Sequence, residues 1–101
     1  MKKVIIIAAG MGKRLRPLTN DMPKCLLKVG RKSILSNQIS IYKSLGLKNI
    51  NIIYGYKKNK FEKKIANFFF NKNYRENNIL ESLFCARKIL NGSCLISYSD
   101  I

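Results

Sequence analysis

The amino-acid sequence predicts a Rossmann-like α/β fold with three layers, α/β/α, around a mainly parallel sheet. Two observations support this fold class. Short apolar runs rich in isoleucine alternate with a segment of helical periodicity, which is the order of elements in strand–helix–strand units. The first apolar run, residues 3–9, is continuous, as in a strand that is buried on both faces of a parallel sheet. At 101 residues, the chain has room for one such core.

The first predicted element is this strand, Lys3 to Ala9, and a long ordered loop follows it. Glycine, proline and short polar residues crowd the positions after the strand, so we expect the chain to turn repeatedly instead of entering a helix at once. The residues that carry this signal are Gly10, Gly12, Pro17, Thr19, Asn20, Asp21 and Pro23.

An amphipathic helix is predicted from Ser33 to Leu45. Ser33 is a suitable N-cap, and Gly46 is a suitable stop after the last turn. A second strand, Asn49 to Tyr54, completes a strand–helix–strand unit, for which a right-handed connection is expected. The apolar residues that fall at helical spacing are Ile34, Leu35, Ile39, Tyr42 and Leu45.

The segment from Lys58 to Phe69 is predicted to form a second helix, with its lysines in solvent. The aromatic residues at its end leave an alternative open, in which Phe68 to Tyr74 begins a short strand. The inner face of the helix would hold Phe61, Ile65 and Phe68 or Phe69.

A third helix is predicted from Asn78 to Leu90, because Asn78 and Glu81 have the spacing of a capping box. The last predicted element is a strand, Cys94 to Tyr98. Ser99 and Asp100 lie just past its carboxyl end, so their polar side chains would reach the edge of the sheet where the other strands also end.

Composition narrows the possible functions. The net charge of +15 attracts polyanions: nucleic acid, anionic lipid or small molecules rich in phosphate. The longest apolar stretch, Val4 to Ala9, is far shorter than the roughly 20 residues that span a bilayer, so no membrane segment is expected. Three cysteines without metal-ligand spacing fit reduced thiols in the cytoplasm, and the lack of histidine disfavours zinc sites.

The loop after the first strand has the features of a phosphate-binding site. Gly10 and Gly12 allow backbone N–H groups to approach an anion closely. In open α/β sheets, ligands bind beyond the carboxyl ends of the strands, where this loop and Asp100 would both project. A glycine turn with solvated basic residues is the alternative interpretation. The basic residues of the loop are Lys13, Arg14, Arg16 and Lys24.

Two well-known phosphate loops do not fit this segment. The dinucleotide-binding fingerprint needs a third glycine where Leu15 stands, and Pro17 interrupts the helix that should follow. The Walker loop needs a hydroxyl residue after its Gly-Lys pair, but Arg14 follows Gly12-Lys13.

A two-part string follows the first strand: Ala8-Ala9-Gly10-Met11-Gly12-Lys13-Arg14-Leu15-Arg16-Pro17-Leu18-Thr19, then Pro23-Lys24-Cys25-Leu26-Leu27 and Val29-Gly30. This string closely resembles the N-terminal signature of the sugar-phosphate nucleotidyltransferase family. The resemblance implies that a phosphate oxygen of a second substrate attacks the α-phosphorus of a nucleoside triphosphate, and that magnesium-bound pyrophosphate leaves. Family members are more than twice as long, so residues 1–101 are expected to be the N-terminal, nucleotide-binding portion of a single nucleotidyltransferase domain.

The resemblance also implies roles for individual residues. Arg14 would hold the leaving phosphates and Lys24 would stabilise charge around the α-phosphate, which makes these two the expected catalytic residues. Asp100 would bind Mg²⁺, the expected cofactor, and Ser99 replaces the glycine that family members often have before it. Lys13 and Arg16 look peripheral. The expected nucleotide-binding set is Ala8, Ala9, Gly10, Met11, Gly12, Lys13, Arg14, Lys24, Asn78 and Ser82.

CTP is the favoured nucleotide, with UTP, dTTP and GTP as alternatives. The string Asn77-Asn78-Ile79-Leu80-Glu81-Ser82-Leu83 resembles cytidylyltransferases that act on choline phosphate and related enzymes of surface-polysaccharide assembly. The chain lacks the Pro-Leu-Gly-Thr-Ala-like segment of the uridylyl and thymidylyl branches. The resemblance therefore implies that the acceptor is a sugar 1-phosphate or choline phosphate. Asn78 is equally suited to capping a helix, and the two roles are compatible.

Two other functions compete with this one. The first is a catalytically inactive fragment that binds nucleotide. The second is a nucleic-acid-binding module, supported by the charge and by five lysines on the solvated face of one predicted helix, but no zinc-finger, RNA-recognition or helix-turn-helix pattern accompanies them. The aromatic residues Tyr54, Tyr56 and Phe61 could stack on a base, but we expect them to fill a core. The five lysines are Lys57, Lys58, Lys60, Lys63 and Lys64.

Overall fold

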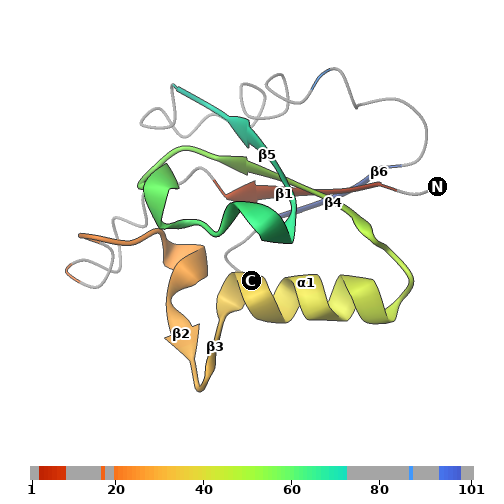
Figure 1. Ribbon diagram of the computed structural model, residues 1–101, viewed down its shortest axis with the longest axis horizontal. Helices are drawn as coiled ribbons and strands as arrows, with labels where there is room; N and C mark the ends of the chain where they lie inside the picture. The colour runs from red at the N-terminus through yellow and green to blue at the C-terminus, as the bar shows by residue number, and fades with distance from the viewer. Residues whose placement is uncertain (1–2, 9–16, 18–19, 73–86, 88–93, 99–101) are drawn as a thin grey trace.

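The computed structural model of the chain describes residues 3–8, 17, 20–72, 87 and 94–98. Its main feature is a sheet of four strands, all parallel to one another (Figure 1). The α/β class and the mainly parallel sheet that the sequence predicts are therefore confirmed. In spatial order the strands are β5 (Asn67–Phe70), β4 (Asn49–Tyr54), β1 (Lys3–Ala8) and β6 (Cys94–Tyr98).

β1 is an interior strand because it pairs with β4 on one side and with β6 on the other. Its residues 4–8 are all buried, as the continuous apolar run predicts. Successive side chains of a strand point to opposite faces of the sheet, so β1 contributes to two apolar clusters. One cluster contains Val4, Ile6 and Ala8 with Ile50 and Ile52, and the other contains Ile5 and Ile7 with Ile53.

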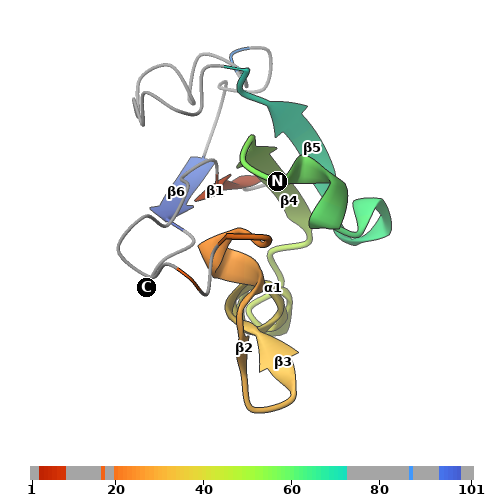
Figure 2. The ribbon, with the colours of Figure 1, turned by 90° about the vertical axis from the view of Figure 1, so that its left-hand side faces the viewer.

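Helix α1 (Ile34–Ser44) covers one face of the sheet (Figures 1 and 2). The predicted N-cap is confirmed: the Ser33 hydroxyl oxygen accepts a hydrogen bond of 3.0 Å from the backbone N–H of Ser36. The predicted stop is confirmed as well. Gly46 follows the helix with φ +83°, a left-handed conformation that glycine adopts without a steric penalty.

The apolar face of α1 is shorter than the sequence suggests. Leu35 and Ile39 are buried against the sheet, and Tyr42 is half-buried beside them. Leu45 is exposed, because it is the C-cap residue and the chain has already begun to leave the helix there. The first two turns of α1 therefore provide most of its contact with the core.

Two short strands that the sequence does not predict precede α1. β2 (Lys28–Val29) and β3 (Lys32–Ser33) form an antiparallel hairpin that projects away from the main sheet (Figure 2). Gly30, the first of the two residues between these strands, has φ +74°, as in a type II′ turn. Strands of two residues are too short to show an alternating apolar pattern in the sequence. Only the glycine of the turn could have indicated this hairpin.

The helix predicted from Lys58 to Phe69 is wrong, and the alternative strand is the correct interpretation of its end. The segment forms two 3₁₀ turns, η3 (Lys58–Lys60) and η4 (Lys63–Ile65), before β5 begins. Consecutive aromatic residues suit a pleated strand, and residues 67–70 pair with residues 51–54 of β4. In β5, Phe68 and Phe69 pack against opposite faces of the sheet, which one inner face of a helix could not achieve.

The last predicted strand is confirmed as β6. The helix predicted from Asn78 to Leu90 lies outside the described residues, apart from Arg87.

Within the described ranges, no helix is long and apolar enough to cross a membrane. The resulting order of strands, with β1 between β4 and β6, determines where a ligand site can form.

Candidate functional site

The carboxyl edge of the sheet has the arrangement that binds ligands in open α/β folds. The chain passes from β1 to β4 on one side and later returns to β6 on the other side of β1. The strand order therefore reverses at β1, and ligands bind outside the carboxyl ends of the strands at such a point. Ala8 and Tyr98 are the last residues of β1 and β6. The glycine loop and Asp100 follow them within two residues in the sequence.

Two of the predicted site residues, Ala8 and Lys24, lie in the described part of the chain. Ala8 is buried at the end of β1, opposite Tyr54 of β4, so it brings the chain to the carboxyl edge of the sheet. The other predicted site residues lie outside the described residues: Ala9, Gly10, Met11, Gly12, Lys13, Arg14, Asn78, Ser82 and Asp100.

Lys24 begins a 3₁₀ turn, η2 (Lys24–Leu26), that packs against α1. Pro23 precedes the turn and is buried, and its carbonyl oxygen accepts the 3.0 Å hydrogen bond that closes the turn. Cys25 is 1% exposed and belongs to the same core cluster as Leu35 of α1. Lys24 itself is half-buried. The core thus fixes the backbone of Lys24, so mainly side-chain freedom is lost when this cation binds an anion.

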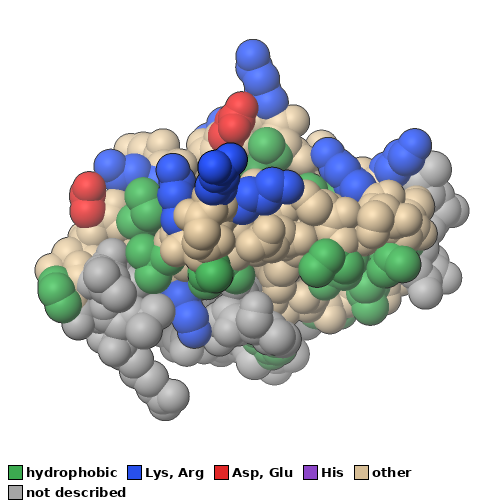
Figure 3. Space-filling model, turned by 90° about the horizontal axis from the view of Figure 1, so that it is seen from below, with side chains coloured by type: hydrophobic (Ala, Val, Ile, Leu, Met, Phe, Trp, Pro, Cys, Tyr) green, Lys and Arg blue, Asp and Glu red, His purple; other side chains and the backbone are tan. Residues whose placement is uncertain are grey.

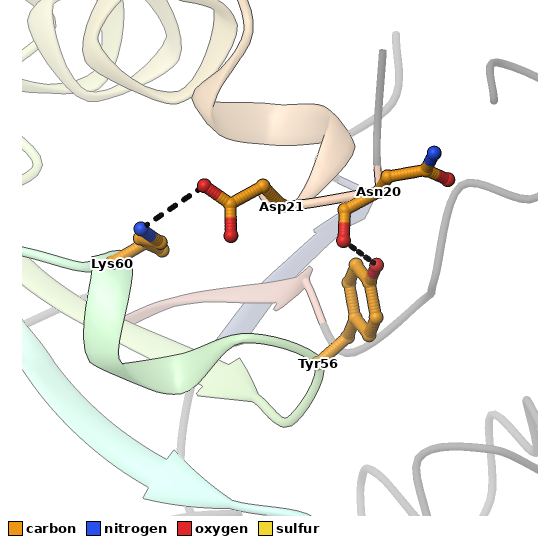
Figure 4. Close-up of polar contacts among 4 residues, drawn as sticks. All are labelled: Asn20, Asp21, Tyr56 and Lys60. Atoms are coloured by element: carbon orange, nitrogen blue, oxygen red, sulfur yellow. Dashed lines mark hydrogen bonds and ion pairs between the residues drawn. The ribbon is translucent and has the colours of Figure 1, made fainter. Parts of the chain in front are cut away.

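Two contacts attach the loop before Lys24 to the segment that follows β4 (Figure 4). Tyr56 lies two residues beyond β4, and its hydroxyl donates a hydrogen bond of 3.1 Å to the backbone carbonyl of Asn20. Close by, Nζ of Lys60 lies 3.3 Å from a carboxylate oxygen of Asp21. Both contacts join residues that are far apart in the sequence, so they fix the loop relative to the sheet.

The two contacts differ in strength. The side chains of Lys60 and Asp21 are 41% and 84% exposed, and exposed ion pairs contribute only about 0–1 kcal/mol to stability. Tyr56 is 7% exposed, so its ring adds packing to a hydrogen bond of about 1 kcal/mol. Tyr56 is therefore the stronger anchor. No local pattern could have assigned it to the site, because its partner Asn20 is 36 residues away.

The aromatic residues at the end of β4 and after it pack in the core, as predicted, instead of forming an open face for a base. Phe61 is 4% exposed. The ring centroid of Tyr54 lies 5.4 Å from that of Phe61 and 4.8 Å from that of Phe68. These are ordinary distances for packed aromatic side chains.

The five lysines that the sequence places on one helix face lie instead on and around η3 and η4. Three of them lie over aromatic rings. The distance from Nζ to the ring centroid is 5.9 Å for Lys57 and Tyr56, 4.1 Å for Lys58 and Phe70, and 4.0 Å for Lys63 and Tyr54. Basic side chains outnumber acidic ones on the face in Figure 3. However, the single helical face of lysines that supported a nucleic-acid-binding module does not form.

Among the described residues there is no cluster of three or more His, Cys, Asp or Glu side chains that could hold a metal ion. The predicted magnesium ligand, Asp100, lies outside them. Mg²⁺ usually takes one or two protein carboxylates and completes its coordination shell with substrate phosphates and water. Asp100 follows the end of β6 by two residues in the sequence, and its carboxylate is the type of ligand that Mg²⁺ takes from proteins.

Comparison with known proteins identifies the family. The model of the nucleotidyl transferase family matches residues 3–82. CTP:phosphoglutamine cytidylyltransferase of Campylobacter jejuni is 38% identical, over 96% of this chain and 43% of the relative. Choline-phosphate cytidylyltransferase of Streptococcus pneumoniae is 40% identical, over 93% of this chain and 43% of the relative. The chain thus spans less than half the length of these curated relatives.

Solved structures agree with these similarities. The CTP:phosphocholine cytidylyltransferase from Streptococcus pneumoniae matches with a TM-score of 0.89 and 37% identity, covering 98% of this chain and 45% of that one. The inositol-1-phosphate CTP transferase from T. maritima matches with a TM-score of 0.80 at 23% identity, over 99% of this chain and 44% of that one, which supports the fold alone. The predicted Rossmann-like fold is therefore confirmed. Together with the family match over residues 3–82, these similarities show that the chain belongs to the nucleotidyl transferase family.

Proposed function

We propose that the chain is the nucleotide-binding part of a cytidylyltransferase. This enzyme would transfer a cytidylyl group from CTP to a phosphate oxygen of a small acceptor and release pyrophosphate. One observation carries the proposal: the glycine-rich signature follows β1 directly in the sequence, and β1 is the strand at which the order of the sheet reverses. A loop with this origin leads into the crevice where open α/β sheets bind their ligands.

CTP is the proposed nucleotide because two curated relatives and a similar solved structure are cytidylyltransferases by name. Asn78 and Ser82 are proposed to contact its base. The names of these relatives include phosphoglutamine, choline phosphate and phosphocholine, which all carry a phosphate on a small molecule. We therefore propose choline phosphate or a sugar 1-phosphate as the acceptor, and a cytoplasmic role in making precursors of surface polysaccharides.

In the proposed reaction, a phosphate oxygen of the acceptor forms a bond to the α-phosphorus of CTP. The bond from this phosphorus to the oxygen that bridges to the β-phosphate breaks, and pyrophosphate leaves with the electron pair. Such a reaction depends mainly on positioning and on neutralising charge. Arg14 would hold the leaving phosphates, and Lys24 would neutralise charge on the α-phosphate. The packing of Cys25 in the core supports the role of Lys24, because it fixes the turn before substrate binds.

Mg²⁺ is the proposed cofactor, and Asp100 is its proposed protein ligand. When bound, the ion would neutralise negative charge on the phosphates of the nucleotide. The chain corresponds to 43% of the length of the curated relatives. We therefore propose that residues 1–101 bind the nucleotide and that turnover requires the part of the domain that the relatives have in addition.

The proposal is tested by calorimetric titration of the folded chain with CTP, UTP, dTTP, GTP and ATP in the presence of Mg²⁺. We expect CTP to bind most tightly. Arg14→Ala and Lys24→Ala should each weaken CTP binding by about tenfold or more, because a charge-assisted hydrogen bond to phosphate is worth about 1.5–3 kcal/mol. Lys64→Ala is the matched control, since Lys64 is exposed and lies on η4, in a different part of the fold.

Two results would contradict the proposal. A chain that shows a native circular dichroism spectrum but binds no triphosphate cannot be the nucleotide-binding part of this enzyme. A chain that binds every polyanion equally, with the same response to Lys24→Ala and Lys64→Ala, is a general polyanion binder. If CTP and UTP bind equally tightly, the proposal of a nucleotidyltransferase stands, but the proposal that it transfers a cytidylyl group is wrong.

A further inference from the structure

A hydrogen bond connects α1 to the carboxyl end of β6. Nε2 of Gln38 donates to the backbone carbonyl oxygen of Tyr98 over a distance of 2.8 Å, across 60 residues of sequence. A carbonyl oxygen can only accept, so the nitrogen of the amide must be the atom that faces it. Tyr98 is the last residue of β6, and Asp100 is two residues further along the chain.

This contact matters because β6 has few other attachments at its end. Among the described strands, β6 pairs only with β1 and forms one edge of the sheet. Tyr98 pairs with Ile7 of β1, but its side chain is 40% exposed, so side-chain packing contributes less there than in the buried strands. The amide of Gln38 adds a further constraint on the carbonyl group of this residue, from the helix beneath the sheet.

The other end of the Gln38 amide is also informative. Its Oε1 is buried and accepts no hydrogen bond within the described part of the structure. A buried amide oxygen without a donor is unfavourable, so an apolar side chain of similar size would suit the position better if stability alone decided the residue. The hydrogen bond from Nε2 to Tyr98 is therefore the interaction that explains an amide side chain at position 38.

The same helix also holds the turn that carries Lys24. Leu35 and Ile39, on either side of Gln38 in the sequence, share a core cluster with Cys25, the residue after Lys24. The first two turns of α1 thus contact both the Lys24 turn and the end of β6. α1 therefore contributes to the relative position of these two segments, together with β1, which pairs with β6 and shares the core cluster of Cys25.

We infer that Gln38 is a positioning residue that fixes the carboxyl end of β6, which precedes Asp100 in the sequence, relative to the turn that carries Lys24. This inference rests on the proposed function, in which Asp100 holds Mg²⁺ and Lys24 neutralises the α-phosphate. Gln38 itself touches neither the metal nor the nucleotide. It acts through the backbone carbonyl group of Tyr98, two residues before Asp100 in the sequence.

The experiment compares CTP binding to the wild-type chain, Gln38→Leu and Gln38→Glu, measured by calorimetry over a series of Mg²⁺ concentrations. Leucine keeps most of the volume and removes the donor, whereas glutamate keeps the shape but presents an ionised carboxylate that cannot donate to a carbonyl. Asn37→Ala, which changes the exposed neighbouring residue of α1, is the control. Hydrogen exchange of a peptide from β6 is measured on the same samples.

We expect both Gln38 variants to raise the Mg²⁺ concentration for half-maximal CTP binding by about threefold or more, as the loss of one hydrogen bond predicts. CTP binding without Mg²⁺ should stay unchanged, and amides of β6 should exchange faster. Lys24→Ala should behave differently and weaken CTP binding at every Mg²⁺ concentration.

Three results would overturn the inference. Variants whose Mg²⁺ requirement equals that of Asn37→Ala show that Gln38 does not position the metal ligand. Variants that weaken CTP binding equally with and without Mg²⁺ show a general structural role instead. If the folded wild-type chain binds no CTP, both the proposed function and the role of Gln38 are wrong. If the wild-type chain binds CTP and the Gln38 variants have the same Mg²⁺ requirement, only the role of Gln38 is wrong.

Discussion

The hydroxyl of Tyr56 and the carbonyl oxygen of Asn20 lie 3.1 Å apart, and their hydrogen bond joins the end of β4 to the loop before Lys24. The bond is partly buried, because the side chain of Tyr56 is buried whereas Asn20 is exposed. It therefore links the stability of the chain to the geometry of the candidate site. Removing only the hydroxyl group of Tyr56 tests the contribution of the hydrogen bond, because the ring and its packing are retained.

Tyr56→Phe should lower the free energy of unfolding by about 1 kcal/mol, because one hydrogen bond of a buried side chain is lost. Urea denaturation followed by circular dichroism measures this change. Tyr42→Phe is the matched control: this half-buried tyrosine packs on the core, and its hydroxyl makes no hydrogen bond to the described residues. Equal stability of the two variants would contradict an anchoring role for the Tyr56 hydroxyl.

Lys60→Ala should change stability by less than about 0.5 kcal/mol, because its ion pair with Asp21 is exposed and screened by salt. A double-mutant cycle with Asp21→Ala, carried out at low and at physiological ionic strength, measures the coupling between the two side chains. A coupling above about 1 kcal/mol that persists at the higher salt concentration would show that this pair, and not Tyr56, is the main anchor of the loop.

Phe61→Ala should destabilise the chain by about 3–5 kcal/mol, since a buried aromatic side chain is replaced by a cavity. Phe70→Ala should cost much less, because Phe70 is partly exposed at the end of β5. Thermal and urea unfolding of both variants check this order. If Phe61→Ala does not fold, Phe61→Leu provides a milder test. Equal losses at the two positions would contradict the core role of Phe61.

The sequence predicts those elements whose signals are local. β1 and β4 are dense runs of isoleucine, and α1 has its cap and its stop within one turn of its ends. In each case the residues that determine the element are neighbours in the sequence. The structure confirms all three: β4 has the predicted bounds, and α1 begins and ends one residue inside the predicted range. β1 begins at Lys3, as predicted, and is described as far as Ala8.

The error over residues 58–69 arises from contacts between distant residues. Lysines spaced along an aromatic segment indicate a helix with a solvated face, but the pairing of β5 with β4 decides the conformation. The hydrogen bond from Nδ2 of Asn67 to Oδ1 of Asn51 adds to this pairing at the start of β5. Neither contribution is visible within a short window of sequence.

In the candidate site, too, local features can be predicted from the sequence, whereas contacts between distant residues cannot. The residue types that suit phosphate chemistry, such as Lys24, can be recognised in a continuous motif. The residues that hold the motif cannot, because Tyr56 reaches Asn20 across 36 positions and Gln38 reaches Tyr98 across 60. A sequence motif thus identifies the chemistry of a site, whereas its rigidity depends on the tertiary fold.

The N-cap of α1 provides the last prediction, because this helix supports both Lys24 and the end of β6. Ser33→Ala removes the acceptor for the backbone N–H of Ser36 and should destabilise the chain by about 1 kcal/mol. Ser36→Ala is the control, since it retains the same N–H donor and changes only an exposed side chain. Urea denaturation compares the two variants. Because Gln38 lies on the same helix, five residues after Ser33, Ser33→Ala should also increase hydrogen exchange in β6. An effect confined to α1 would contradict the coupling between the two elements.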